Sequence, residues 1–344
     1  MTMNVFKGSA VTSAHSPLRL VIDTDCANEI DDQFALAWAL LAPDKLQVEA
    51  TIAAPFSFRH HLPPLRAATD PAYQIWAARL ADEGRSIDDL DRDLVDPAAG
   101  MALSLQEIRH IHHLCRADPP AYAGATRYMT AADDVVWSAG AEALVDLAKS
   151  GTEPLYVAAM GCVTNIAAAL IRAPEIAHRI TVLWTAGFPT LQPHPQHSAL
   201  NLVQDPHATR ILFDCGVPLI YLPGYHIGAQ LRISKPEMRS YVKGKGPLGD
   251  YLWSLYDNNP IQHMRAVSDT DRRSWVIWDM IDIAWLLNPD WVPTFETPSP
   301  VLTDDLCWQA APGRHLIREA YDINRDDIFR DFYDRLAAFA AVTD

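Results

Sequence analysis

Cysteine is scarce in this chain, and long apolar runs are absent. The 344 residues include five cysteines, an odd number, far apart and without a C-x-x-C pair. That usage argues against a disulfide framework or a zinc knuckle and fits a reducing compartment. No run of about 18 apolar residues occurs, so we expect no membrane span. Residues 1–17 hold no apolar segment of signal-peptide length, and we expect a loose N-terminal arm on a cytoplasmic protein.

Basic residues are few relative to acidic ones. The chain has 28 lysines and arginines against 43 aspartates and glutamates, a formal charge of −15. Nucleic acids and anionic membrane surfaces bind to basic patches, so this balance argues against both as partners. It fits a small neutral or cationic substrate. The hydrophobic fraction of 49% is ample for the core of a large α/β domain.

The most informative stretch is residues 18–42, where an apolar run is followed by an acidic turn and a helical pattern. Residues 20–22 are typical of a buried parallel strand, and Asp23-Thr24-Asp25 ends it. A helix is predicted from Ile30 to Leu41, with Asn28 as its N-cap. Four carboxylates therefore gather where a strand ends and a helix begins, which is the ligand crevice of an open α/β sheet: Asp23, Asp25, Asp31 and Asp32.

These carboxylates would repel one another unless a cation offset their charge. Only oxygen ligands are offered, which favours Ca²⁺ or Mg²⁺ over Zn²⁺. A simpler alternative is that Asp31 and Asp32 only interact favourably with the positive end of a helix dipole. This alternative leaves Asp23 and Asp25 unexplained. An EF-hand loop does not fit, because Asn28 and Phe34 stand where that loop has its glycine and its bidentate glutamate.

Two enzyme families have a motif similar to this stretch. A strand followed by Asp-x-Asp resembles the nucleophile motif of haloacid-dehalogenase-type phosphatases, although Cys26-Ala27-Asn28 stands where those enzymes have glycine or a hydroxyl residue. That phosphatase remains the alternative. Asp-Thr-Asp, a short turn and Ile-Asp-Asp at a helix start more closely resemble the signature of the inosine–uridine-preferring nucleoside hydrolases. The turn from Cys26 to Glu29 is two residues longer than the commonest family form.

Two further blocks resemble the same family in the same order. Residues 161–165, GCVTN, are similar to its Gly-x-Leu-Thr-Asn block, where the carbonyl before the glycine binds Ca²⁺; Met160 is the matching residue. Residues 199–206 are similar to the Glu-x-Asn-x-x-x-Asp-Pro block, whose Glu and Asn hold ribose hydroxyls. Asn201 and Asp205 match, but Ala199 stands at the Glu position. We therefore expect weaker sugar binding or a different sugar.

The last match lies in the apolar segment 275–287. A carboxylate in such a segment is costly unless something pairs with it, and the resemblance places Asp279 on the aspartate that closes the Ca²⁺ site. A helix N-cap is the alternative. Trp278 precedes it, as in the purine-preferring branch of the family, where a tryptophan stacks on the base. Core packing is the alternative for this tryptophan.

The remaining elements are predicted from periodicity. Strands are expected over 46–54, 155–160, 181–185 and 218–222. Helices are expected over 134–150 and 325–341, and two further helices are expected to end at residues 171 and 215. Residues 56–130 are expected to form helices and loops over one face of the sheet. Residues 289–344 are expected to wrap around the same domain, because no linker or repeat marks a boundary.

The resemblance implies one α/β domain over residues 18–344, with a mostly parallel sheet flanked by helices. It implies hydrolysis of the N-glycosidic bond of a ribonucleoside, or a close relative, by metal-bound water that Asp25 activates. Asp25, Asp32, Asp279 and the Met160 carbonyl would hold Ca²⁺, Asp31 and Asn201 the ribose hydroxyls, and Trp278 the base. A homodimer or homotetramer is implied by analogy. A non-catalytic metal-binding protein of the same fold is a further alternative, motivated by Ala199.

Overall fold

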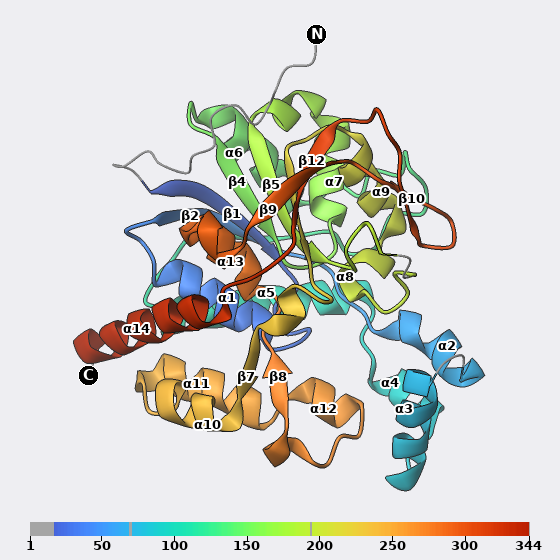
Figure 1. The fold of residues 1–344 in the computed structure, drawn as a ribbon, viewed down its shortest axis with the longest axis vertical. Helices are drawn as coiled ribbons and strands as arrows, with labels where there is room; N and C mark the ends of the chain where they lie inside the picture. The colour runs from blue at the N-terminus through green and yellow to red at the C-terminus, as the bar shows by residue number, and fades with distance from the viewer. Residues whose placement is uncertain (1–16, 69–70, 193–194, 344) are drawn as a thin grey trace.

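The computed structural model describes residues 17–68, 71–192 and 195–343, and its centre is an eight-stranded sheet (Figure 1). The strand order is β3-β2-β1-β4-β5-β6-β12-β9. All neighbours pair in parallel except β9, which runs antiparallel to β12 at one edge. The strands are β1 (Leu18–Thr24), β2 (Leu46–Ala53), β3 (Ala121–Ala123), β4 (Leu155–Ala159), β5 (Ile180–Ala186), β6 (Leu219–Pro223), β9 (Thr294–Pro298) and β12 (Leu316–Ala320).

Helices cover both faces of this sheet. One face packs against α1 (Asp31–Leu40), α5 (Pro97–Leu114) and α13 (Met280–Leu287), while α11 (Gly246–Asp257) packs on α5 and α14 (Arg325–Thr343) packs on α1. The other packs against α6 (Ala139–Ser150), α7 (Thr164–Arg172) and α9 (Pro206–Asp214). The apolar run of β1 is continuous because both of its faces are buried. Leu20 and Ile22 belong to the core on the first face and Val21 to the core on the second, and all three are fully buried.

Helix α1 is enclosed by protein along nearly its whole length. Every residue from Asp31 to Ala39 is buried. The Phe34 ring lies 5.8 Å from that of Phe332 on α14, and the Trp38 indole donates a 2.8 Å hydrogen bond to Asp331. Because α14 and the sheet hold α1 from two sides, the aspartates at its first turn have a fixed position.

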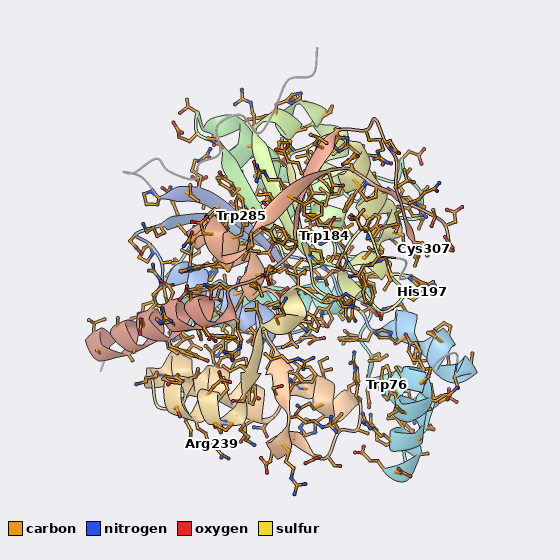
Figure 2. The ribbon with its side chains drawn as sticks, in the orientation of Figure 1. Trp76, Trp184, His197, Arg239, Trp285 and Cys307 are labelled. Carbon is orange, nitrogen blue, oxygen red and sulfur yellow. The ribbon has the colours of Figure 1, made fainter. Side chains whose placement is uncertain are left out.

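Two smaller groups of elements extend from this body beside the carboxyl ends of the strands (Figure 1). The first, α2 (Leu62–Ala67), α3 (Pro71–Asp82) and α4 (Ile87–Asp93), has its own apolar core. The second contains α10 (Lys235–Glu237), α12 (Pro260–Met264) and the antiparallel pair β7 (Arg232–Ser234) and β8 (Ser274–Val276). Trp76, in the first group in Figure 2, donates a 3.2 Å hydrogen bond to the Met264 carbonyl, so the two groups touch.

Three short elements complete the chain. Helix α8 (Leu200–Val203) lies beside β5, and the pair β10 (Val301–Leu302) and β11 (Trp308–Gln309) packs near α9. Trp184, on β5, is fully buried in the centre of the molecule (Figure 2). Its indole donates a 3.0 Å hydrogen bond to the Gly161 carbonyl, which ties the β4–α7 turn to β5.

The predicted α/β fold with a mostly parallel sheet flanked by helices is confirmed as a single domain. The expected N-cap is wrong: Ile30 precedes α1, and the Asn28 side chain instead donates to Asp25 at 2.9 Å. Helix α6 begins at Ala139 rather than residue 134, because Ser138 caps it. Strands β3, β9 and β12 were not predicted.

All five cysteines are free, and among the described residues no helix is long and apolar enough to cross a bilayer. Residues 1–16 of the expected arm lie outside the described residues.

The enclosure of α1 makes a stability prediction. Replacing Phe34 by Ala removes a fully buried ring and leaves a cavity between α1 and α14, so the free energy of unfolding should fall by about 3–5 kcal/mol in urea titration. The matched control is Ile75→Ala on α3, where the side chain is 52% exposed and the change should stay within about 0.5 kcal/mol. Equal losses in both variants would contradict this packing.

Candidate active site

A cavity of about 720 Å³ opens at the carboxyl end of the sheet. Its inner wall is made of the residues that directly follow or end four neighbouring strands: Asp25 after β1, Met160 after β4, Thr185 to Gly187 at β5, and Gly224 to His226 after β6. The strand order reverses between β1 and β4, and in open α/β sheets a ligand crevice forms at this reversal.

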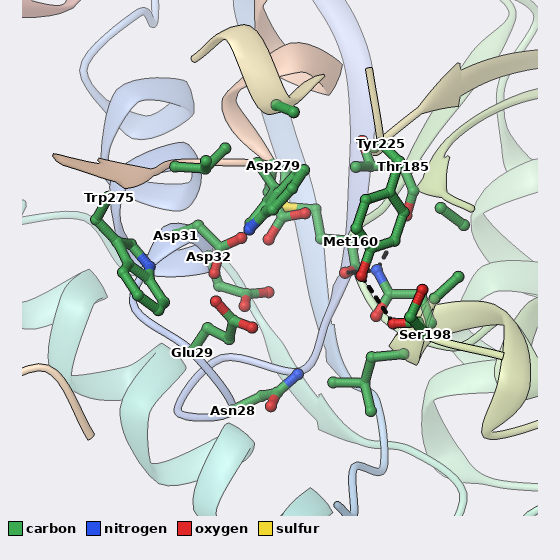
Figure 3. A pocket seen from close by; sticks show the side chains of 18 of the residues that line it. Asn28, Glu29, Asp31, Asp32, Met160, Thr185, Ser198, Tyr225, Trp275 and Asp279 are labelled. Atoms are coloured by element: carbon green, nitrogen blue, oxygen red, sulfur yellow. Dashed lines mark hydrogen bonds between the residues drawn. The ribbon is translucent and has the colours of Figure 1, made fainter. Parts of the chain in front are cut away.

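Three aspartates meet in this cavity from opposite ends of the chain. Asp31 and Asp32 are the first two residues of α1, and Asp279 precedes α13. Figure 3 shows the three side chains converging. Carboxylate oxygens from all three lie within 4.8 Å of one another, and none of the three residues is more than 4% exposed. Asp279 takes the N-cap position of α13 but makes no side-chain cap bond, so its carboxylate is left for the cluster.

Burial and mutual repulsion work against ionisation of these groups. Burial raises the pKa of Asp31 well above its usual value, and the charges of Glu29 and Asp32 raise it further. Burial also raises the pKa of Asp279, with Asp31 and Asp32 adding to the rise. Asp32 shows the same rise from burial and from Asp25, opposed by a hydrogen bond from the Thr24 hydroxyl. A cation among these oxygens would remove the repulsion.

The cluster therefore fits a divalent metal ion. The donor set consists only of oxygens, which hard cations prefer. The carboxylates of Asp31, Asp32 and Asp279 lie close enough together for members of this cluster to share one ion. The predicted ligands Asp32 and Asp279 are brought together here, and Asp31, which was assigned to the sugar, joins them.

Asp25 borders the aspartate cluster and is held in place from two sides. Its carboxylate accepts the 2.9 Å hydrogen bond from Asn28, and it is 1% exposed. A Cβ added at Gly161 would come within 3.1 Å of the Asp25 Cγ, so only glycine leaves Asp25 this much room. Burial and the charge of Asp31 raise the pKa of Asp25 well above its usual value.

The other predicted residues divide into those that face the cavity and those that do not. Met160 and Asn201 line it, and the Asn201 amide donates to the Met160 carbonyl at 2.7 Å and to the Thr185 carbonyl at 2.9 Å. Asp23 instead accepts from Asn165 at 3.1 Å and is not part of the lining. Asp205 accepts from the Ala208 amide at 2.9 Å and caps α9, so its role is structural.

Part of the cavity wall is aromatic. Trp278 lines the cavity with its ring 5.5 Å from that of Tyr225, inclined at 61°. The Tyr225 hydroxyl donates to the Ser198 carbonyl at 2.9 Å, a bond visible in Figure 3. The next residue, Ala199, is 3% exposed and lines the cavity without any polar side-chain atom.

Sequence reasoning missed Glu29 and the basic side of the cavity. Glu29 stands in the lengthened turn, and its side chain lies beside Asp31 and Asp32 in Figure 3. Burial raises its pKa, and the charge of Arg265 opposes that rise. The extra length of the turn was the available signal for Glu29. No motif surrounds Arg265, which reaches the cavity from the end of α12.

Comparison with known families decides the assignment. Residues 98–324 match the family model described as inosine-uridine preferring nucleoside hydrolase. The chain belongs to this family. Because the match begins at residue 98, it does not depend on the aspartates around β1. As a nucleoside hydrolase the chain is an enzyme that hydrolyses the N-glycosidic bond of a ribonucleoside to ribose and free base.

Individual relatives agree with this assignment. The chain is 27% identical over 282 residues to the non-specific ribonucleoside hydrolase RihC of Salmonella agona, covering 79% of each protein. The fold is similar to that of the purine-preferring ribonucleoside hydrolase from Gardnerella vaginalis, with a TM-score of 0.69, 16% identity and coverage of 94% and 99% of the two chains. The inosine-uridine preferring nucleoside hydrolase from Bacillus anthracis gives a TM-score of 0.59, 14% identity and the same coverage.

Membership of the nucleoside hydrolase family replaces the phosphatase alternative. The family is metal-dependent, and this agrees with the aspartate cluster.

The aspartate cluster predicts metal-linked stability. Adding a divalent metal ion at 100 times its dissociation constant should stabilise the protein by about 2.7 kcal/mol, seen as a higher melting temperature. Asp32→Asn should weaken or abolish this shift because it removes a charged ligand from the cluster. The control is Asp88→Asn on α4, whose side chain is 76% exposed and which should keep the full shift. A shift that survives Asp32→Asn would contradict the site.

Proposed function

We propose that this enzyme holds Ca²⁺ at Asp25, Asp32, Asp279 and the Met160 carbonyl and uses Asp25 as the general base of nucleoside hydrolysis. The single observation that supports this most strongly is the meeting of Asp31, Asp32 and Asp279 beside Asp25 in one cavity. These residues come from three separate points of the chain, and a purely structural role would leave four buried carboxylates in mutual repulsion.

Asp25 is suited to take a proton from the attacking water. A general base must lie within hydrogen-bond reach of that water, and Asp25 borders the cluster around which the reaction would take place. The Asn28 amide and the close approach of Gly161 restrict its orientation. Bound at the cluster, a divalent ion would orient the water and lower its pKa.

The remaining acids would stabilise the positive charge that develops on the sugar. Cleavage of a glycosidic bond passes through an oxocarbenium-like transition state, which carboxylates placed beforehand around the ring stabilise. Asp31 and Asn201, which both line the cavity, are the residues we assign to the ribose hydroxyls. The amide nitrogen of Asn201 is held by two carbonyls, which orients its oxygen for a hydroxyl donor.

We propose a purine as the preferred base. Trp278 and Tyr225 form the aromatic wall, and a purine offers a larger face for stacking than a pyrimidine. The Gardnerella vaginalis enzyme of similar fold is described as purine-preferring, whereas the Salmonella relatives are described as non-specific. The homo-oligomer implied by the family resemblance is a separate expectation, which light scattering in solution tests.

A catalytically inactive relative is the second candidate, because Ala199 removes the acceptor that the family uses for ribose. Base release from a panel of purine and pyrimidine nucleosides, with and without a chelator, separates the two. Release that the chelator abolishes supports the enzyme. Ca²⁺ binding without release from any nucleoside or nucleotide supports the inactive relative.

Asp25→Asn tests the base directly. The change keeps the shape of the side chain and one oxygen but removes its basicity, so kcat should fall by a factor of about 10²–10⁴ while the protein still folds and binds substrate. Steady-state base release and a melting curve check both parts. Asp88→Asn serves again as the control. Near-normal turnover by Asp25→Asn would contradict the mechanism.

Trp278→Ala tests the purine preference. Loss of the stacking ring should raise KM for inosine more than for uridine, by about five- to tenfold, since stacking on a base is worth about 1–3 kcal/mol in single-stranded nucleic-acid sites. Parallel kinetics on the two nucleosides provide the measurement. Equal increases for both would mean that Trp278 packs against the core and not against the base.

A further inference from the structure

The outer half of the cavity is lined by arginines. Five reach it, and they come from the two groups of elements outside the sheet: Arg79 on α3, Arg232 on β7, and Arg265, Arg272 and Arg273 between β7 and β8. Lysine is absent from the lining. The charge of the whole chain is −15, so this local excess of arginine runs against the composition.

These arginines differ from those elsewhere in their pairing. Among the described residues, only Arg272 of the five has an ion pair, to Asp269 at 4.0 Å, and both side chains are largely exposed. Of the 17 arginines elsewhere, twelve pair with a carboxylate. Four of the five cavity arginines, Arg79, Arg232, Arg265 and Arg273, therefore have no ion pair among the described residues and lie where a ligand can reach them.

Arg265 is the most constrained of the five. Its guanidinium lies 5.8 Å from the centre of the Trp76 ring, and its Nε is buried without a hydrogen-bond partner. Its charge reaches Glu29, yet the two side chains form no ion pair, and one Glu29 oxygen is also buried and unpartnered. If Arg265 served only to neutralise Glu29, the two would be in contact. The Arg265 Nε donor is instead left for a group in the cavity.

Arg265 also acts on the wall that carries Ala199. Arg265 and Tyr225 both line the cavity. Burial raises the pKa of Tyr225, and the hydrogen bond to Ser198 and the charge of Arg265 oppose that rise. The Tyr225 hydroxyl is bonded to the Ser198 carbonyl, next to Ala199. A carboxylate at residue 199 would repel an anion bound at Arg265. An alanine there leaves this end of the cavity uncharged and open.

We propose that the outer half of the cavity is a subsite for an anionic group, phosphate or carboxylate, carried at the sugar end of the substrate, with Arg265 as its main contact and Arg79 and Arg273 at its rim. This rests on the proposed function. The substrate class is then a ribonucleotide or a similar acidic riboside rather than a neutral nucleoside. Guanidinium groups bind phosphate and carboxylate in a planar, two-pronged manner, which suits arginine here.

The reaction remains the one already described. For inosine 5′-monophosphate, the C1′–N bond breaks, the hydroxyl of water bonds to C1′, and the proton goes to the leaving base. The products are hypoxanthine and ribose 5-phosphate. No phosphate ester is cleaved, so the phosphate contributes only to binding.

Paired substrates test the subsite. We expect kcat/KM for inosine 5′-monophosphate to exceed that for inosine by about 10- to 100-fold, the range for hydrogen bonds to charged groups, with ribose 5-phosphate as the product identified by mass spectrometry. Arg265→Leu should reduce this ratio by about the same factor. Arg109→Leu, which removes an exposed arginine outside the cavity, should leave the ratio unchanged. A wild-type preference for inosine would overturn the proposal.

A second variant keeps the subsite testable if Arg265→Leu fails to fold, and a binding measurement keeps it testable if turnover is lost. Ala199→Glu restores a carboxylate to the wall without touching Arg265, and it should shift the ratio toward inosine. Calorimetry on Asp25→Asn, which binds without rapid turnover, should show tighter binding of the monophosphate than of inosine. Equal binding of the two would overturn the subsite. Faster cleavage of orotidine than of uridine, with no gain from a 5′-phosphate, would overturn its placement at the sugar end.

The two proposals can fail separately. If neither inosine nor its monophosphate releases base, but the monophosphate binds more tightly and loses that advantage in the Arg265→Leu background, the proposed function fails and the subsite stands. If inosine is hydrolysed and the phosphate gives no advantage in binding or turnover, the subsite fails and the function stands.

Discussion

Repulsion among buried carboxylates is the constraint on which the rest of this structure depends. Asp25, Asp31, Asp32 and Asp279 have almost no contact with water, and the charge of at least one other member of the group raises the pKa of each. A single helix on the sheet could not hold such a cluster together. The rigid enclosure of α1 fixes two of the acids, the β1 end fixes one, and the start of α13 brings the last from more than 200 residues away. The fold thus holds charges that would otherwise separate, and a cation converts their repulsion into binding.

The parts of the fold that the sequence predicted share one property. Buried parallel strands need largely apolar runs, so β1, β4, β5 and β6 were visible as such, and β2 was visible from its apolar residues at alternate positions. The central-sheet strands that were not predicted, β3, β9 and β12, lack such a run. β3 has three residues, and β9 and β12 are half-exposed strands near the sheet edge in a proline-rich region. Their pairing is decided by neighbours far along the chain and leaves no local apolar run.

The same division applies to the site. The aspartates at β1 and α1 stand next to a strand end, so their convergence could be predicted from local pattern alone. Asn28 was assigned to a helix cap because its position fits one, but the longer turn carries it to Asp25. The arginines could not have been found in this way. They lie on separate short elements, and the net charge of the whole chain pointed to a neutral or cationic substrate. Whole-chain charge averages over surfaces that face different surroundings.

The separate core of α2, α3 and α4 has a consequence for how this protein can change. Those helices pack mainly on one another. Arg79 on α3 lines the cavity, as do Phe58 and His61 from the segment just before α2. Substitutions at this rim would therefore leave the folding of the sheet and the aspartate cluster largely untouched. Evolution or protein design could therefore exchange one class of substrate for another by changing the two smaller groups of elements. The aspartate cluster and its chemistry would stay the same.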